Sequence, residues 1–277
     1  MGRDVRELWR LDGRIAIITG GAGFLGEMHG EAIAEAGGIP ILIDIRGDVA
    51  AEKAKRLAER YAVPAMGFHA DVTDPSSLQQ VVHEIVGRFG RLDVLINNAA
   101  NDPKVKADGL VAGTRFENFP LSQWTGDLAV GLTGAFLCCQ VMGGQMAKQG
   151  SGSIINISSD LGLIAPDQRL YRQPGLSEDK QPVKPVSYSV VKHALIGLTR
   201  YLATYWADRN IRVNALAPGG VRNEQPDEFV RRVSSLIPMG RMAGKDEYKG
   251  AIVFLASDAS SYMTGATLVM DGGKTCW

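Results

Sequence analysis

Short apolar runs alternate with longer amphipathic stretches along most of the chain. The apolar runs lie at 15–18, 39–45, 65–68, 94–96, 153–157, 212–217 and 267–270. Helical periodicity fills the intervals, up to residue 36 after the first run and then at 49–61, 75–89, 121–148, 187–207 and 247–256. Apolar runs that alternate with helices in this way are typical of parallel strands joined by right-handed crossovers. The pattern therefore predicts an α/β fold, a doubly wound parallel sheet of about seven strands with helices on both faces.

Length and composition favour one domain. The chain has 277 residues, of which 45% are apolar, which is ample material for a large buried core. A polar lead covers 1–12, and beyond it we find no linker rich in Pro, Gly or Ser and no fixed repeat. We therefore expect a single domain over residues 1–277.

Charge and cysteine content narrow the partners and the location. The 30 basic and 30 acidic residues give a net charge of zero without long runs of either sign, so neither a nucleic-acid nor a membrane partner is expected. No apolar run reaches the length that spans a membrane. Three cysteines give no disulfide framework, which favours a cytoplasmic location. The four histidines show no metal-ligand spacing, so we expect no metal.

A glycine-rich turn follows the first predicted strand and opens a helix. It reads Thr19-Gly20-Gly21-Ala22-Gly23-Phe24-Leu25-Gly26. Glycines here let the backbone turn tightly and approach a pyrophosphate, whose charge is met by N–H groups at the helix N-terminus. A tight turn without a ligand is the alternative. We expect the turn to bind a dinucleotide through Gly20, Gly23, Phe24, Leu25 and Gly26.

Asp44 bears on the choice of dinucleotide. It ends the second predicted strand, at about the spacing from the glycines that a ribose-binding acid has. A carboxylate there accepts hydrogen bonds from both ribose hydroxyls and repels a 2′-phosphate, which predicts NAD rather than NADP. Arg46 leaves NADP open, because its flexible guanidinium could reach a phosphate.

Tyr188 and Lys192 stand four residues apart at the start of an amphipathic run. On a helix, this spacing places both side chains on one face, one turn apart. A neighbouring cation favours the phenolate and lowers the pKa of the phenol from its usual value of about 10. The pair can therefore exchange a proton near neutral pH, although the same spacing also occurs by chance on helix surfaces.

Together these motifs resemble the short-chain dehydrogenase/reductase family, from Leu11 to Gly273. The resemblance also rests on Asp71-Val72, Asn97-Asn98-Ala99-Ala100, Ser158-Ser159, Pro218-Gly219-Gly220-Val221 and Asp271-Gly272-Gly273. It implies a Rossmann-type domain in which Ser159 holds the substrate oxygen, Tyr188 exchanges the proton, and Lys192 lowers the tyrosine pKa and binds the nicotinamide ribose. It further implies adenosine contacts from Asp71, Val72, Asn98, Ala99 and Ala100, and contacts at the nicotinamide end from Pro218, Gly219, Val221 and Asn223.

Several features depart from the family pattern. The short, single-domain branch spaces its glycines as TGxxxGxG, whereas Gly23 and Phe24 give TGxxGxxG, which is similar to the extended branch that mostly modifies nucleotide sugars. We expect the Phe24 side chain to turn away from the cofactor. Gly131 stands where family members commonly have an asparagine whose backbone carbonyl holds a relay water. The Gly131 carbonyl could still bind that water, but glycine destabilises a helix interior by roughly 1 kcal/mol relative to alanine and has no side chain to fix a kink. We therefore expect a weakened or differently supported proton relay. Ser158 remains an alternative to Ser159.

A polar, Pro-punctuated insertion at about 165–184 separates Ser159 from Tyr188. A loop between two catalytic residues must lie at the rim of the substrate pocket. Its composition favours a small polar or anionic substrate, and Arg169 or Arg172 would pair with a phosphate or carboxylate on it. A solvated or oligomer-facing loop is the alternative.

The predicted function is NAD-dependent hydride transfer between a secondary alcohol or ketone and nicotinamide, with Tyr188 as general acid and base. The physiological direction stays open. An epimerase or dehydratase acting on a nucleotide-linked sugar is one alternative, and a non-catalytic NAD-binding regulator is another. The resemblance also implies a homo-oligomer, a dimer or tetramer, through the helices at 121–148 and 187–207.

Overall fold

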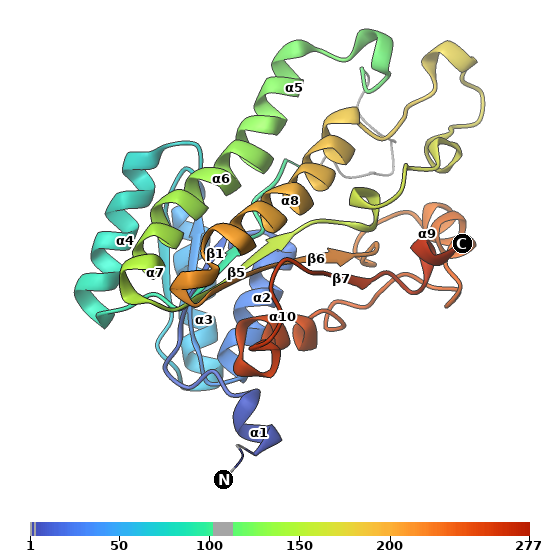
Figure 1. Ribbon diagram of the computed structural model, residues 1–277. Helices are drawn as coiled ribbons and strands as arrows, with labels where there is room; N and C mark the ends of the chain where they lie inside the picture. The colour runs from blue at the N-terminus through green and yellow to red at the C-terminus, as the bar shows by residue number, and fades with distance from the viewer. Residues whose placement is uncertain (1, 3, 102–112) are drawn as a thin grey trace.

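One parallel sheet forms the centre of the computed structural model, which describes residues 2, 4–101 and 113–277 (Figure 1). Its strand order is β3-β2-β1-β4-β5-β6-β7. The strands are β1 (Ile15–Thr19), β2 (Ile39–Asp44), β3 (Met66–His69), β4 (Val94–Asn97), β5 (Gly152–Ile157), β6 (Ile211–Pro218) and β7 (Thr267–Met270). Each predicted apolar run forms one of these strands, so the predicted doubly wound sheet is confirmed.

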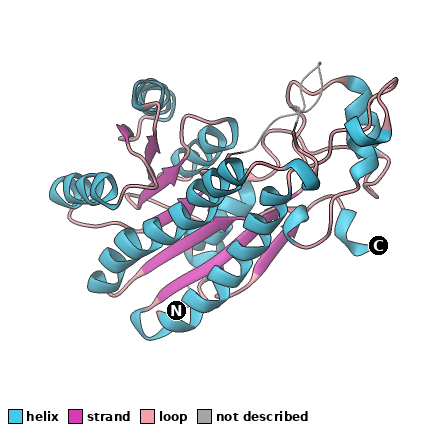
Figure 2. Cartoon of the chain, turned by 90° about the horizontal axis from the view of Figure 1, so that it is seen from above, coloured by secondary structure: helices cyan, strands magenta, loops and turns pink. Residues whose placement is uncertain are grey.

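Helices cover both faces of the sheet (Figure 2). One layer holds α2 (Phe24–Glu35), α3 (Gly47–Tyr61) and α10 (Lys249–Ala256), and the other holds α4 (Pro75–Phe89), the helical segment 121–149 and α8 (Val186–Tyr205). Side chains of β1 alternate between the layers, because successive residues of a strand point to opposite faces. Ile17 joins the core with α4 and α8, and Ile18 joins the core with α2 and α10.

The helical segment 121–149 is continuous but not uniform. It consists of α5 (Leu121–Leu128), the π-helical turn η2 (Ala129–Thr133), α6 (Gly134–Cys138), a second π-helical turn η3 (Cys139–Gly143) and α7 (Gly144–Gln149). By length and composition it is long and apolar enough to cross a membrane, which corrects the expectation that no run reaches that length. Cys138 and Cys139, which belong to this segment, are buried in the core, and burial raises the pKa of the Cys139 thiol to about 12.

Several short helices were not predicted. They are α1 (Val5–Leu8) in the polar lead, α9 (Asp227–Ser234), and the single 3-10 turns η1 (Phe116–Asn118), η4 (Asp160–Gly162), η5 (Gln168–Tyr171), η6 (Glu178–Lys180), η7 (Ala207–Arg209), η8 (Asp258–Ser260) and η9 (Lys274–Cys276). Each is too short for its periodicity to stand out in the sequence.

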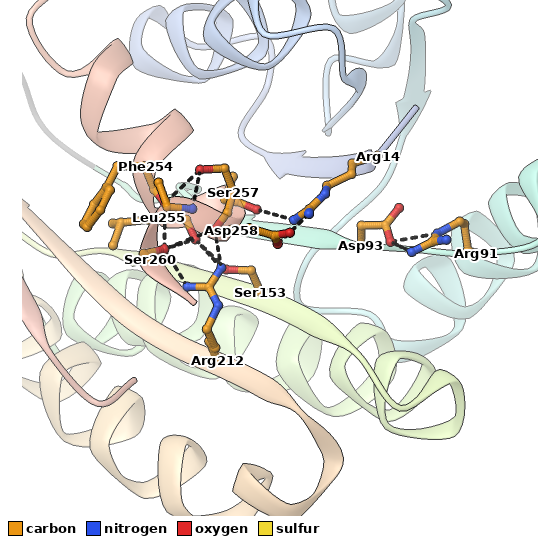
Figure 3. A network of polar contacts seen from close by, with 12 residues as sticks. Arg14, Arg91, Asp93, Ser153, Arg212, Phe254, Leu255, Ser257, Asp258 and Ser260 are labelled. Carbon is orange, nitrogen blue, oxygen red and sulfur yellow. Dashed lines mark hydrogen bonds and ion pairs between the residues drawn. The ribbon is translucent and has the colours of Figure 1, made fainter. Parts of the chain in front are cut away.

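Partly buried charged groups lie at the N-terminal edge of the sheet, where the strands begin (Figure 3). The Arg212 guanidinium donates to Ser260 Oγ at 2.7 Å and to the carbonyl oxygens of Leu255 and Ser257 at 2.9 and 3.0 Å. Burial lowers the pKa of Arg212 to about 10, so it stays charged at neutral pH. Beside it, Arg14 pairs with Asp258 at 2.5 Å. This edge ties β6 to the segment after α10.

Candidate active site

The opposite, carboxyl edge of the sheet brings the predicted site residues together. β1 has β2 on one side and β4 on the other, so the chain reverses its direction of winding at β1. Crevices at such a reversal, outside the carboxyl ends of the strands, are where open α/β sheets bind ligands. The glycine turn follows β1, and Asn98 follows β4 at this point.

The glycine turn has no room for side chains where a dinucleotide would approach. Gly20 has a φ of +64°, which is costly for other residues. A Cβ at Gly26 would overlap the Gly20 carbonyl, and one at Gly20 would lie 3.0 Å from Ala99 Cα. The helix α2 then starts at Phe24 with Gly23 as its N-cap, which supplies no side-chain cap, so backbone N–H groups are left to meet an anion. These features fit the pyrophosphate of a dinucleotide.

The Asp44 carboxylate is held against this turn. Its Oδ2 accepts a hydrogen bond from the Ala22 N–H at 3.1 Å, and its Oδ1 accepts from the Arg46 N–H at 3.0 Å. Arg46 Nε lies 3.4 Å from the same Oδ1, so its guanidinium faces Asp44. A buried carboxylate therefore stands where the sequence predicted a ribose partner.

Thr19 joins the ends of β1 and β4, a role that the sequence analysis did not assign. Its Oγ1 accepts hydrogen bonds from the N–H groups of Asn98 and Ala99, each at 2.9 Å. The Asn98 side chain donates in return to the Thr19 carbonyl at 2.9 Å. This exchange holds Ala99 beside the glycine turn, where a Cβ at Gly20 would lie 3.0 Å from Ala99 Cα, and the predicted adenosine contacts of Asn98, Ala99 and Ala100 remain predictions.

The residues predicted beside the adenine lie at the end of β3. Asp71 Oδ1 accepts from the N–H and the hydroxyl of Thr73 at 2.8 and 2.7 Å, so its carboxylate shapes its own loop. Val72 is buried against Gly134, where a Cβ would come within 2.7 Å of it. Their contact with an adenine remains a prediction.

The two candidate serines have different partners. Ser158 donates its hydroxyl hydrogen bond to the Lys192 carbonyl at 2.7 Å and so fastens the end of β5 to α8. Ser159 Oγ accepts from the Leu161 N–H at 3.1 Å and donates to Asp160 Oδ1 at 2.7 Å. Both hydroxyl groups therefore donate within the protein, Ser158 to α8 and Ser159 to its neighbour Asp160, and the assignment of Ser159 as the serine that meets substrate stays a prediction.

Tyr188 and Lys192 lie one turn apart at the start of α8. Lys192 is buried, and its Nζ donates to the Ile157 carbonyl at 2.7 Å and lies 5.6 Å from the centre of the Tyr188 ring. A second ammonium, that of Lys184, lies 3.7 Å from the centre of the same ring. Two cations thus flank the phenol, and both favour its ionised form.

An ion pair with little solvent exposure lies behind Ser159, and the sequence analysis did not predict it. Lys274 Nζ, from the C-terminal turn η9, contacts Asp160 Oδ2 at 2.7 Å, and both side chains are almost fully buried. Asp160 is the residue to which Ser159 donates. The C-terminal segment therefore sets the position of the candidate catalytic hydroxyl.

Gly131 lies opposite α8 in the π-helical turn η2. A Cβ at this position would come within 2.7 Å of Val191 Cγ1. The absence of a side chain lets the helical segment approach α8 closely, which gives a packing reason for the departure from asparagine.

The segment after β6 forms the far side of the site. Pro218 ends the strand, Gly219 N–H donates to the Met270 carbonyl at 2.9 Å, and Val221 forms a bridge with Ala243. Asn223 is exposed, and its N–H donates to Gln225 Oε1 at 2.7 Å. A cavity of about 280 Å³ lies beside this segment, lined mainly by Gly219, Gly220, Ile237, Met239, Tyr248 and Met270.

The insertion at 165–184 is structured and packs on α9. The Tyr171 and Phe229 rings lie 5.9 Å apart, and Arg232 donates to the Arg172 carbonyl at 2.8 Å. Arg169 pairs with Asp167 at 2.6 Å and Arg172 with Glu178 at 2.7 Å. Both arginines have carboxylate partners within the loop, so their pairing with a substrate anion remains a prediction.

Comparison with known proteins identifies the family. The model for the short chain dehydrogenase family matches residues 14–171, and one described as Enoyl-(Acyl carrier protein) reductase matches 177–275. The D-threitol dehydrogenase of Mycolicibacterium smegmatis is 34% identical over 273 residues, covering 96% of this chain and 95% of the relative. The NAD-dependent glycerol dehydrogenase of Listeria innocua is 30% identical over 267 residues, covering 95% and 94%.

A solved structure agrees with these relatives. The gluconate 5-dehydrogenase of Burkholderia cenocepacia, in complex with NADP and tartrate, superposes with a TM-score of 0.83 at 30% identity, covering 99% of this chain and all of the other. The glycine turn, the carboxyl-edge crevice and the Tyr188–Lys192 pair agree with this kinship. The chain belongs to the short-chain dehydrogenase/reductase family and is an oxidoreductase that transfers a hydride between an alcohol or ketone and a nicotinamide cofactor.

Proposed function

We propose that this protein uses NAD to oxidise a secondary hydroxyl group of a small polyhydroxylated compound, or to reduce the matching ketone. The observation that carries the proposal is the position of Tyr188, flanked by two ammonium groups, at the crevice edge that also holds Ser159 and the glycine turn. Relatives named for threitol, glycerol and gluconate support a short, hydroxyl-rich substrate.

The chain's own groups supply the acid–base chemistry. A bound NAD would accept the hydride from the carbinol carbon. Ser159 would hold the substrate oxygen by turning its hydroxyl from Asp160, which exchanges one hydrogen bond for another. Tyr188 as phenolate would take the hydroxyl proton, and the ammonium group of Lys192 would keep the phenol acidic.

Asp44 supports the preference for NAD. Its carboxylate is fixed by the Ala22 and Arg46 N–H groups at the place where the adenosine ribose is expected, so a 2′-phosphate would meet a negative charge. The relatives use either cofactor, because glycerol dehydrogenase is named for NAD and the gluconate enzyme holds NADP. The preference is therefore a property of these residues rather than of the family.

We also propose a homo-oligomer. The large exposed apolar side chains include Phe136 on α6 and Val190, Tyr201 and Tyr205 on α8, and the two tyrosine rings stack at 5.9 Å. Exposed aromatic groups on neighbouring helices are typical of subunit contacts. Sedimentation of the wild type and of Phe136→Asp tests this, since a charge in such a contact should dissociate the assembly.

The decisive experiment pairs cofactor binding with turnover. Fluorescence titration with NADH and NADPH should show tighter binding of NADH, and a panel of tetritols, pentitols, hexitols and sugar acids should reveal a substrate by reduction of the nicotinamide. Asp44→Ala should reduce the preference for NAD about tenfold or more, since a hydrogen bond to a charged group contributes about 1.5–3 kcal/mol. As a control, Asp48→Ala, at an exposed position, should leave the preference for NAD unchanged. Tighter binding of NADPH by the wild type would contradict the cofactor proposal.

A further inference from the structure

A small cavity lies between the helical segment 121–149 and the catalytic end of α8. Its lining is made of Ala100, Asn101, Asp127, Gly131, Ser187, Tyr188, Val191 and Lys192. It has room for about one water molecule. The mechanism above uses Tyr188 and Lys192 and gives no role to the third ionisable residue in this lining, Asp127.

Asp127 is a buried carboxylate with a defined set of partners. It is 4% exposed, its Oδ2 accepts a hydrogen bond from Ser187 Oγ at 2.5 Å, and its Oδ1 accepts from Gln123 Nε2 at 2.7 Å. Ser187 is itself buried and directly precedes Tyr188. Gln123 is exposed, so Asp127 stands between the cavity and the protein surface.

The position of Asp127 relative to Gly131 links it to the altered relay. The two residues are four apart, so the carboxylate lies on the same helix face as Gly131, one turn earlier. An asparagine at 131 would collide with Val191. The helix thus lacks the side chain that the family commonly has at position 131, although the Gly131 backbone carbonyl is still present, and it carries an acid one turn earlier on the same face.

We propose that Asp127, held by Ser187, is a positioning residue that carries protons between the cavity and solvent and so serves Tyr188 and Lys192. This inference deepens the proposed hydride transfer at the same site. In alcohol oxidation, the hydride goes to the nicotinamide and the hydroxyl proton goes to Tyr188. That proton then passes by way of Lys192 and a cavity water to the Asp127 carboxylate, which releases it beside Gln123. Reduction of the ketone runs the same path in reverse.

Asp127 also acts on Tyr188 through its charge. Among the described residues, two ammonium groups lie near the Tyr188 ring, that of Lys184 from the segment before α8 and that of Lys192 from α8 itself. Asp127 lines the same cavity as Tyr188, and the Asp160–Lys274 pair lies behind Ser159. The two lysines favour the phenolate, whereas a nearby carboxylate disfavours it. Removing the Asp127 charge should therefore lower the pKa of Tyr188.

Asp127→Asn tests the relay, because the amide keeps the shape but cannot take up a proton. In weak buffer we expect kcat for alcohol oxidation to fall about tenfold, and added imidazole to restore much of it by accepting the proton directly. The wild type should not respond to imidazole. Without any turnover, ultraviolet difference titration of the free protein, with Tyr188→Phe as the reference, should show a lowered pKa for Tyr188.

Two further variants keep the test sharp. Ser187→Ala retains the carboxylate but removes its support, so we expect a smaller loss with the same response to imidazole. Asp93→Asn alters an equally buried carboxylate at the opposite sheet edge and should show no imidazole response.

Three outcomes would overturn the relay: a wild-type rate for Asp127→Asn in weak buffer, a loss that no buffer restores, or an unchanged pKa of Tyr188. A wild type that reduces no nicotinamide with any hydroxyl compound would contradict the proposed function instead, and the Tyr188 titration would still decide the role of Asp127.

Discussion

The two edges of the sheet bury charge in different ways. At the N-terminal edge, the Arg212 guanidinium is surrounded by Ser260 and by two backbone carbonyl groups (Figure 3). At the carboxyl edge, Lys192 donates to the Ile157 carbonyl and also lines a cavity. A charge whose hydrogen bonds all go to the surrounding protein holds segments together, whereas a charge that lines a cavity can also act on what enters it.

This contrast predicts different effects of substitutions at the two edges. Substitutions at the N-terminal edge should lower the free energy of unfolding and leave turnover intact. Substitutions at the carboxyl edge should lower turnover with a smaller effect on stability. The predictions below test this division, beginning with the largest expected effect.

Tyr188→Phe should give the largest loss. The substitution removes only the phenol hydroxyl group, and general acid–base catalysis typically raises the rate about 10²–10⁴-fold. We expect kcat to fall by about 10³-fold, while NADH affinity, measured by fluorescence, and the midpoint of thermal unfolding change little. Retention of a tenth or more of the wild-type kcat would remove Tyr188 from the proton transfer.

Arg212→Met should have the opposite effect, a loss of stability without a loss of activity. The variant removes the three hydrogen bonds that the Arg212 guanidinium donates, although the Leu255 carbonyl keeps its bond from Ser153 Oγ at 2.8 Å. A hydrogen bond from a charged group contributes about 1.5–3 kcal/mol. We expect the free energy of unfolding in urea to fall by about 2–4 kcal/mol, with kcat/KM nearly unchanged. Arg209→Met, which breaks an exposed pair with Asp208, is the matched control. A large fall in kcat/KM for Arg212→Met would break the division between the edges.

The sequence predicted the sheet and the outline of the site well, for identifiable reasons. Strands buried on both faces appear as continuous apolar runs, as in β1 and β2, and the residues that follow parallel strands gather at one edge without further information. The glycine turn, Asp44 and the Tyr188–Lys192 pair could therefore be placed before any coordinates.

What the sequence could not supply depends on contacts between distant segments. Lys274 meets Asp160 across 114 residues of chain, and α9 is held by apolar contacts with the insertion at Leu170. Asp127 had a local signal, an acid in an apolar helix four residues before Gly131, but only the fold shows that it lines a cavity together with Tyr188. Arg169 and Arg172 illustrate the reverse case, since the loop supplies their carboxylate partners.

His29, in the middle of α2, is a buried group for which we find no hydrogen-bond partner at Nε2 within the described residues. Burial lowers its pKa from 6.5 to about 4. Between these values the unfolded chain binds the proton and the folded protein does not, so stability falls as the pH drops from 6.5 toward 4. The full difference between the pKa values of His29 in the unfolded and folded states corresponds to about 3 kcal/mol in the free energy of unfolding. Urea unfolding of the wild type across this range should show the fall, and His29→Leu should remove that part of it. An unchanged pH dependence in the variant would mean that other groups cause it.

Lys274→Met should give the smallest change in free energy among these variants, and it tests whether the ion pair behind Ser159 acts on catalysis. The change leaves the Asp160 carboxylate buried without its cation, so the carboxylate should draw the Ser159 hydroxyl more strongly and hold it away from substrate. We expect kcat/KM to fall about tenfold, which is about 1.4 kcal/mol of lost transition-state binding. The double variant with Asp160→Asn removes the unpaired charge and should recover part of the loss. If the double variant is no more active than the single one, Lys274 acts by packing the C-terminal turn rather than through the charge of Asp160. The ion pair behind Ser159 would then have a purely structural role, like the charged groups at the N-terminal edge, and would differ from Lys192, which lines a cavity.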